Sequence, residues 1–247
     1  MLVRLALVSF AWLLAACGDG DDGGDQSNAA DQESADEAIA AVEQSLRDGG
    51  FSAADDEDGD GDDDDDDDLS FESDECQEFD EAFSAGGGAS FPGETASAET
   101  DTFELDELAQ RGVAESVNAS VEFVEDQDQL DVVDEMLNDE RLETCFEEAF
   151  RIGFEDTGDE GDAIAIGDVQ AEKLASQGLG DGGGGVQVTA ELTAEGVTLP
   201  IAFGLEVARV ERAAVSVFSI ALGPGQPSAD RAELLQILVD SVSEQSS

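Results

Sequence analysis

The stretch Ala213-Ala214-Val215-Ser216-Val217-Phe218-Ser219-Ile220-Ala221-Leu222 decides the fold, because it carries apolar side chains on both sides of an extended chain. Successive side chains of a strand point to opposite faces of the sheet. Val215 and Val217 therefore share one face, and Phe218, Ile220 and Leu222 share the other. A strand that is apolar on both sides is typically covered on both faces. We predict that this strand lies at the centre of the sheet.

The segments on either side of this strand predict an antiparallel meander followed by a helix. Two tight turns, Ala194-Glu195-Gly196 and Glu211-Arg212, separate runs that alternate like strands. The strands that we predict in this half of the chain are 163–169 or slightly longer, 186–194, 197–210 and 213–222. Pro227 and Ser228 then begin a terminal helix, and its apolar residues can pack back on the sheet: Leu234, Leu235, Leu238 and Val242.

The N-terminal half mixes helical and strand patterns. Ser34 and Glu37 form a capping box, which predicts a first helix at 35–48, and Ser73 can cap a second helix. Further on, the patterns predict strands at 102–105 and 116–124 and two nearly continuous helices around Leu130–Leu137 and Leu142–Phe150. The fold class is therefore α+β, an antiparallel β-sheet with packed α-helices. A pair of small repeats is the alternative, because Cys76-Gln77-Glu78-Phe79 and Cys145-Phe146 both place aromatic residues after a cysteine.

The N-terminal segment predicts a membrane anchor. Arg4 is followed by an apolar run from Leu5 to Leu14, and the small residues Ala15 and Ala16 precede Cys17. A short apolar run of this kind is typical of a signal peptide and is too short for a membrane span. Leu-Ala-Ala-Cys resembles a bacterial lipobox, which implies that Cys17 carries a diacylglyceryl group. Two acyl chains hold a protein stably on a membrane, so we expect a lipid-anchored protein on the extracytoplasmic face of the cell membrane.

The other two cysteines predict a disulfide. Cys76 and Cys145 remain once Cys17 is lipidated, and an even pair in an exported chain is typically oxidised. Each lies on a predicted helix beside phenylalanines, so the bond would join two helices inside an apolar cluster. The alternative is a reactive thiol, but neither cysteine has a basic neighbour in the sequence that would lower its pKa.

The charge of the chain is strongly negative and restricts its partners. The formal net charge is −54, and residues 69–247 still carry 41 acidic side chains against seven basic ones. Such a surface repels nucleic acid, so we expect no nucleic-acid partner. Acid-rich and lysine-poor surfaces resemble those of proteins from salt-rich habitats, where salt screens the self-repulsion. The sequence contains no histidine, which excludes Ser-His-Asp triads and histidine zinc sites.

Three other patterns could carry chemistry, and each favours a structural interpretation. Asp56-Glu57-Asp58-Gly59-Asp60-Gly61 matches the opening of an EF-hand loop, but position twelve falls on Asp67 instead of Glu and no amphipathic helix flanks it. Gly178-Leu179-Gly180-Asp181-Gly182-Gly183 matches a dinucleotide-binding fingerprint, yet a strand follows where a helix is required. Paired carboxylates could hydrolyse glycosides, although so acidic a chain will always bring some pair together. We therefore predict no cofactor, no metal site and no catalytic residue.

The order of elements resembles a family of envelope proteins. The run from Val207 to Val215, a strand, a tight turn and an apolar strand, leads through Gly223-Pro224-Gly225 to an amphipathic last helix. This order resembles actinobacterial envelope lipoproteins, the extracellular sensor domain of PknH-type kinases and LpqN-like lipoproteins with a PsbP-like fold. The resemblance covers roughly residues 70–245. It implies a non-enzymatic, sensor-like module that binds an envelope ligand or protein partner.

The expected organisation is a signal peptide at 1–16, a disordered acidic linker at 17–33, a helix at 34–50, a disordered Asp/Gly-rich loop at 51–69 and an α+β extracytoplasmic domain at 70–247. Two other functions remain open from the sequence. One is a calcium-dependent envelope scaffold, and the other is a hydrolase that uses carboxylates alone.

Overall fold

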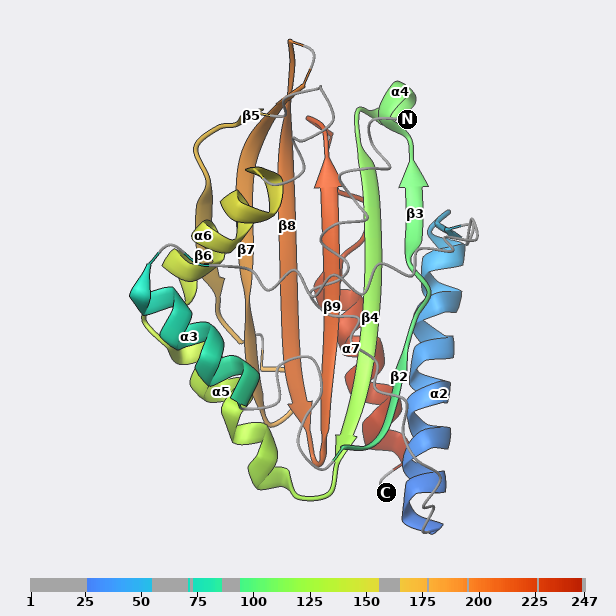
Figure 1. Cartoon of the computed structure of the whole chain (residues 1–247). Helices are drawn as coiled ribbons and strands as arrows, with labels where there is room; N and C mark the ends of the chain where they lie inside the picture. The colour runs from blue at the N-terminus through green and yellow to red at the C-terminus, as the bar shows by residue number, and fades with distance from the viewer. Residues whose placement is uncertain are drawn as a thin grey trace, which may run out of the picture.

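The computed structural model describes residues 26–54, 71, 73–85, 94–155, 165–176, 178–194, 196–225 and 227–245. They form one antiparallel sheet with helices on both faces, which confirms the predicted α+β class (Figure 1). The helices are α2 (Gln26–Asp48), α3 (Asp74–Ala85), α4 (Leu108–Arg111), η1 (Gln127–Leu130), α5 (Asp131–Asn138), α6 (Leu142–Glu155) and α7 (Arg231–Gln245). The strands are β1 (Ser52–Ala53), β2 (Glu94–Glu99), β3 (Phe103–Asp106), β4 (Ala114–Val124), β5 (Ala165–Ile166), β6 (Gln170–Leu174), β7 (Gly182–Ala194), β8 (Val197–Val210) and β9 (Ala213–Leu222).

β9 lies at the centre of the sheet, as its two apolar faces predict. The strand order is β1-β3-β4-β9-β8-β7-β5, and β2 and β6 pair with β4 and β7 respectively. Val215 and Val217 face one side of the sheet and are fully buried, while Phe218 and Ile220 are buried on the other. β8 and β9 have the predicted bounds, and the predicted turn at Glu211-Arg212 joins them.

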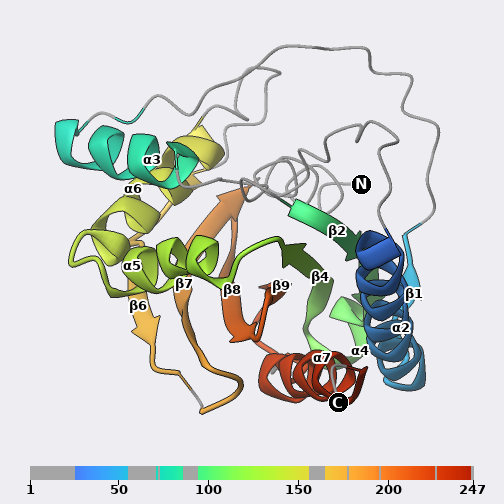
Figure 2. The same ribbon diagram turned by 90° about the horizontal axis from the view of Figure 1, so that it is seen from below.

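One face of the sheet is covered by α2 and α7. Figure 2 shows α7 on the opposite side of the sheet from α3, α5 and α6. The buried residues of this face come from both helices and from the sheet, and they include Ala35, Ala38, Val42, Val117, Val121, Val215, Val217, Leu234, Leu238 and Val242. The terminal helix therefore packs back on the sheet as its apolar pattern predicts, although it begins at Arg231, a few residues after Pro227.

The other face is covered by α3, α5 and α6 over the β7–β9 half of the sheet. Phe150 of α6 packs on Phe154 of the same helix and on Phe203 of β8. Phe203 in turn packs edge-to-face on Phe218 with ring centroids 4.8 Å apart. Ser73 caps α3, as predicted, because its hydroxyl accepts a hydrogen bond from the backbone N–H of Cys76. The carboxylates of Asp131 and Asp134 tie α5 to β8 through Arg209, at 2.8 and 2.9 Å.

The start of α2 differs from the prediction. The helix begins at Gln26, so residues 26–33 are helical where a disordered linker was expected, and the expected cap at Ser34 lies inside the helix. A domain was expected to begin at residue 70, but α2 packs in the same core as the sheet. Its residues Ala35, Ala38 and Val42 belong to one buried cluster with residues of the strands. Tertiary contacts therefore override the capping signal in the local sequence.

The sheet also holds strands that the sequence pattern does not predict. β1, β2 and β6 were not expected. Within the described part of the strand expected at 163–169, only the two residues of β5 form a strand. β7 begins at Gly182, four residues before its expected start, because glycine lets β8 approach closely. A Cβ at Gly183 would lie 2.2 Å from the carbonyl oxygen of Val207.

Two carboxylates of α6 protect the edge strand β6. Glu147 and Glu143 accept hydrogen bonds from the backbone N–H groups of Ala171 and Lys173, at 3.0 and 2.9 Å. Residues four apart on a helix and two apart on a strand span similar lengths, about 6 and 7 Å, so the two rows match. Edge N–H groups that are occupied in this way cannot pair with another chain.

Candidate functional site

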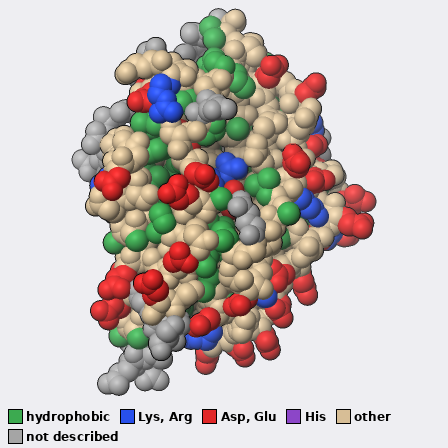
Figure 3. Space-filling model, turned by 180° about the vertical axis from the view of Figure 1, so that it is seen from behind, with side chains coloured by type: hydrophobic (Ala, Val, Ile, Leu, Met, Phe, Trp, Pro, Cys, Tyr) green, Lys and Arg blue, Asp and Glu red, His purple; other side chains and the backbone are tan. Residues whose placement is uncertain are grey.

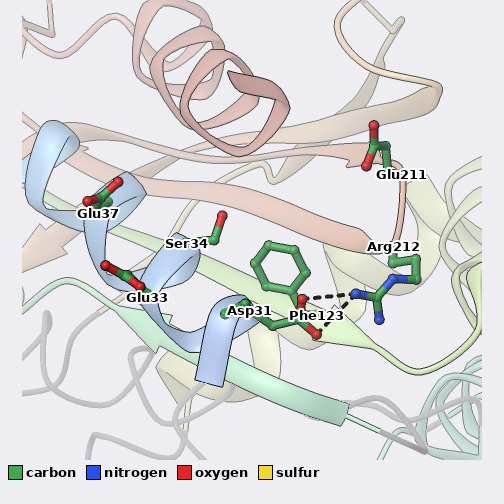
Figure 4. A pocket seen from close by; sticks show the side chains of 8 residues that line it. Asp31, Glu33, Ser34, Glu37, Phe123, Glu211 and Arg212 are labelled. Atoms are coloured by element: carbon green, nitrogen blue, oxygen red, sulfur yellow. Dashed lines mark hydrogen bonds and ion pairs between the residues drawn. The ribbon is translucent and has the colours of Figure 1, made fainter. Parts of the chain in front are cut away.

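The described residues form a hollow at the end of the molecule where α2 begins. Its volume is about 580 Å³, and α2, the end of β4 and the β8–β9 turn enclose it (Figure 4). It is lined by Ala30, Asp31, Glu33, Ser34, Glu37, Phe123, Glu211 and Arg212. A concave site with a few polar groups and an aromatic wall is the usual form of a small-molecule site.

An ion pair between Asp31 and Arg212 forms one wall of the hollow. One terminal nitrogen of Arg212 donates to both oxygens of Asp31, at 2.9 and 3.1 Å, and the other donates to the carbonyl oxygen of Val124 at 2.8 Å. The hydroxyl of Thr95 lies 3.0 Å from Asp31 Oδ2 and donates to it. The charge of Arg212 is therefore neutralised by the protein itself, and this arginine joins α2 to the sheet.

The β8–β9 turn places Glu211 at the rim of the hollow. Glu211 has a φ of 55°, the only positive φ of a non-glycine residue among those described. Two-residue hairpin turns require such a conformation, which is costly for glutamate. The turn is supported by Asp181, whose carboxylate accepts a hydrogen bond from the backbone N–H of Glu211 at 2.9 Å. The glycine-rich segment before β7 thus has a structural role, as its sequence favours.

Ser34 and Asp31 are the two buried polar residues that line the hollow. Ser34 is 6% exposed, and its hydroxyl is not among the described side-chain atoms that are buried without a hydrogen-bond partner. In Figure 4 the hydroxyl is directed into the space between α2 and the turn that carries Glu211. A serine hydroxyl that faces a hollow can donate to and accept from a bound molecule. In the sequence Ser34 fits the pattern of a helix cap, and that pattern gives no sign that the residue lines a hollow.

The lining of the hollow is negatively charged. Glu33 and Glu37 lie one turn apart on α2, and Glu211 lies on the turn across the hollow (Figure 4). The only basic residue in the lining, Arg212, is already paired with Asp31. Acidic side chains are also spread over the rest of the surface, as Figure 3 shows for one face. The hollow therefore attracts cations and repels anions.

A second polar cluster lies beneath the start of α7 and is structural. Arg231 donates to Glu206, Ser219 and Gln187 on the sheet, at 3.2, 3.1 and 3.2 Å. Glu115, which is 2% exposed, accepts hydrogen bonds from the backbone N–H groups just before α7. Burial raises the pKa of Glu115, and these two hydrogen bonds oppose the increase. These bonds hold α7 on the sheet, although the hydroxyl of Ser228, beside Glu115, is buried without a hydrogen-bond partner among the described residues.

Glu122 on β4 is a buried carboxyl group with an unsatisfied oxygen. Its Oε2 atom is inaccessible to solvent and has no hydrogen-bond partner among the described residues. Burial, together with the nearby carboxylates of Glu94 and Glu99, raises the pKa of Glu122 to about 8. The protonated form is therefore favoured near neutral pH.

The structure brings together the two cysteines that were predicted to pair. Cys76 of α3 and Cys145 of α6 form a disulfide, with their Cα atoms 5.2 Å apart, inside the apolar cluster on the α3, α5 and α6 face of the sheet. Cys17 and the EF-hand-like register at 56–67 lie outside the described residues. Within the described ranges, no three acidic or cysteine side chains are arranged to hold a metal ion. No described helix has the length and hydrophobicity of a membrane span.

Comparisons with known proteins give no relative. No protein-family model matches the chain, and neither a curated protein nor a solved structure was found to match it.

Proposed function

We propose that this protein is a non-enzymatic binding module, anchored by lipid on Cys17 to the extracytoplasmic face of the cell membrane. We propose further that the hollow at the start of α2 is its ligand site. The observation that supports this most directly is the hollow itself, which has a volume of about 580 Å³ and combines polar side chains with Phe123 in its lining. A ligand with both polar groups and an apolar part would match such a lining.

The chemistry of the hollow favours binding over catalysis. Carboxylate catalysis needs two carboxyl groups with separated pKa values that converge on one substrate atom. In the hollow, Asp31 is held by Arg212 and Thr95, while Glu33 and Glu211 are exposed to solvent at the rim. Such groups can attract and orient a ligand, but the ion pair commits the one buried carboxylate to the fold.

The position of the hollow is consistent with an anchor on Cys17. Gln26, the first residue of α2, follows Cys17 by nine residues, which can span at most about 30 Å. The end of the molecule that bears the hollow would then remain close to the membrane surface. Replacement of Cys17 by alanine should move the protein from the membrane fraction to the soluble fraction and abolish labelling by a palmitate analogue. Retention of both properties would contradict the anchor.

The binding site can be tested by filling the hollow. Ala30 lines the hollow and is exposed, and Ala40 is exposed on the same helix without lining it. The experiment measures the unfolding midpoint with a panel of amines, amino sugars, glycans and headgroup fragments. At least one compound should give a saturable increase. Ala30→Trp should abolish the increase and Ala40→Trp should preserve it. An increase that survives in Ala30→Trp, or a panel without any saturable increase, would contradict the proposal.

A further inference from the structure

Glu122 of β4 lies next to Phe123, which lines the hollow, and faces β2, the strand between β4 and α2 (Figure 1). We propose that Glu122 is a switch: its ionisation moves β2 away from β4 and thereby alters the wall of the hollow at Asp31. The wall belongs to the proposed ligand site, so the meaning of the switch for binding rests on the proposed function. The coupling itself is measured without a ligand.

Polar side chains of β2 lie beside the carboxyl group of Glu122. Ser97 pairs with Glu122 in the register of the two strands, and Glu99 lies two residues further along β2 on the same face. The hydroxyl of Ser97 donates to Glu94 Oε1 at 2.7 Å, so the donor opposite Glu122 is already used. The Oε2 atom of Glu122 is buried without a hydrogen-bond partner among the described residues. This environment favours a protonated carboxyl group over a carboxylate.

The other described elements beside Glu122 do not compensate a negative charge there. Ala214 of β9 pairs with Glu122 in the register, and Leu130 of η1 packs on Ala214. Arg212, at the turn before β9, is paired with Asp31. The charged residues at the start of η1 are acidic and exposed: Glu125, Asp126 and Asp128.

The cluster sets the pH at which Glu122 changes its charge. Burial, together with the carboxylates of Glu94 and Glu99, raises the pKa of Glu122 to about 8. Glu122 is therefore protonated below this pH and becomes a buried carboxylate above it.

A β-bulge connects β2 to the wall of the hollow. The pairing with β4 shifts between Glu94 and Ala96, which makes Thr95 an extra residue of β2. Such a bulge redirects a side chain. The hydroxyl of Thr95 lies 3.0 Å from Asp31 Oδ2 and 3.3 Å from the carbonyl oxygen of Phe123. One hydroxyl thus contacts both β4 and the part of α2 that forms the wall.

A second contact makes α2 follow a movement of β2. The side-chain amide of Gln32 donates to the carbonyl oxygen of Ser97 at 2.9 Å, and Ser97 is the residue opposite Glu122. An ionised Glu122 is repelled by the carboxylates of β2 and receives no hydrogen bond from Ser97, so β2 shifts away from β4. The shift disturbs the contacts of β2 with Gln32 and Asp31 and hence the wall of the hollow.

The test is carbon-detected NMR of the purified full-length protein, titrated from about pH 6 to about pH 10. The side-chain carboxyl resonances of Glu122 and Asp31 should shift with one common midpoint, at the pKa of about 8. Glu122→Gln should abolish the Asp31 transition, and Glu135→Gln, which removes an exposed carboxylate from α5, should preserve it. An Asp31 resonance that does not follow Glu122 would overturn the inference.

Two variants of Thr95 test the route from Glu122 to the wall. Thr95→Val removes the hydroxyl that contacts Asp31, so it should keep the transition of Glu122 and lose most of the shift of Asp31. Thr95→Ser keeps the hydroxyl and should retain both. The resonance of Glu122 shows in each variant that its buried environment is preserved. Equal shifts of Asp31 in the two variants would contradict the role of the bulge.

Matched double variants separate the cluster from general surface charge. Glu94→Gln with Glu99→Gln removes the two carboxylates beside Glu122 and should lower the midpoint by at least about half a pH unit. Glu172→Gln with Glu191→Gln removes two exposed charges from β6 and β7 and should leave the midpoint nearly unchanged. Equal changes would show that Glu122 responds only to the overall charge, which is evidence against the switch.

The outcomes also separate the switch from the proposed function. If Asp31 follows Glu122 but no compound gives a saturable increase that Ala30→Trp abolishes, the switch stands and the hollow is not a ligand site. If Asp31 does not follow Glu122, the inference fails, and the compound panel with Ala30→Trp decides the proposed function independently.

Discussion

Arg212 and Asp31 lie 181 residues apart in the sequence, yet one terminal nitrogen of Arg212 lies 2.9 and 3.1 Å from the two oxygens of Asp31. The same guanidinium donates to the carbonyl oxygen of Val124 at the end of β4. A single side chain thus joins α2, β4 and the β8–β9 turn around the hollow. Since 12% of the Asp31 side chain and 41% of the Arg212 side chain are exposed, the pair is only partly screened by water.

Arg212→Lys should therefore lower the free energy of unfolding although it keeps the charge. Lysine cannot donate to Asp31 and Val124 in the same planar geometry, so we expect a loss of about 1–2 kcal/mol in urea unfolding. Arg111→Lys is the matched control, because Arg111 pairs with Glu107 four residues away on the surface. It should change stability by less than about 0.5 kcal/mol. Equal losses in the two variants would contradict this role of Arg212.

Glu122 should make the protein less stable as the pH rises. The pKa of Glu122 is about 8 in the folded protein and 4.5 for an ordinary glutamate. Between these values the folded state retains a proton that the unfolded state releases, so the free energy of unfolding falls with increasing pH. Glu122→Gln should remove this fall and gain a few kcal/mol relative to the wild type above pH 8. The measurement is urea unfolding of both proteins at pH 5, 7 and 9, with the exposed Glu135→Gln as control. A difference in the free energy of unfolding between Glu122→Gln and wild type that stays constant across this pH range would contradict this role of Glu122.

Gly204 should be required for the docking of α7. A Cβ at this position would lie 2.2 Å from the Cζ atom of Arg231 and 2.4 and 2.7 Å from its Nη1 and Nε atoms. Gly204→Ala should displace Arg231 from Glu206, Ser219 and Gln187 and cost about 2–4 kcal/mol of stability. A double-mutant cycle with Arg231→Ala tests the mechanism, because the two losses should not add. Additive losses would show that Gly204 acts independently of Arg231.

Loss of the disulfide should destabilise the protein without affecting the hollow. Cys76 and Cys145 are 69 residues apart, and closing a loop of that length contributes about 4 kcal/mol in the chain-entropy model. The double variant Cys76→Ser, Cys145→Ser should lose most of this in urea unfolding, and a reductant should lower the midpoint of the wild type alone. A wild-type midpoint that ignores the reductant would show that the bond contributes little.

Salt should stabilise the fold by screening its charge. The net charge of −54 opposes compaction, and the screening length falls from about 10 Å at 0.1 M to about 3 Å at 1 M salt. The unfolding midpoint should therefore rise continuously in sodium chloride. Submillimolar calcium should add nothing, and replacement of residues 56–67 by serine and glycine should not change this. A saturable jump with calcium that the replacement abolishes would instead favour the calcium-dependent scaffold.

The sequence by itself determined the β7–β9 part of the sheet and the covalent link between two helices. The central position of β9 could be predicted because Val217 and Phe218 are apolar on opposite sides of the strand. The turn could be predicted because the charged pair Glu211-Arg212 separates two runs that are rich in apolar residues. The pairing of Cys76 with Cys145 followed from elimination once Cys17 was assigned to the anchor. The strand and turn predictions depend only on neighbouring residues, and the disulfide prediction depends only on the number of cysteines.

The tertiary structure alone decided where α2 begins and where the hollow lies. Asp31 and Ser34 resemble linker and cap residues in the sequence. Only the approach of Arg212 and Phe123 from distant parts of the chain makes Asp31 an ion-pair partner and places Ser34 in the lining of a hollow. β2 was missed for the same reason, because its alanines and serines form a strand through pairing with β4. The physical reason is that a local pattern records the backbone preference of a segment, whereas burial and charge pairing depend on which distant segments fold against it.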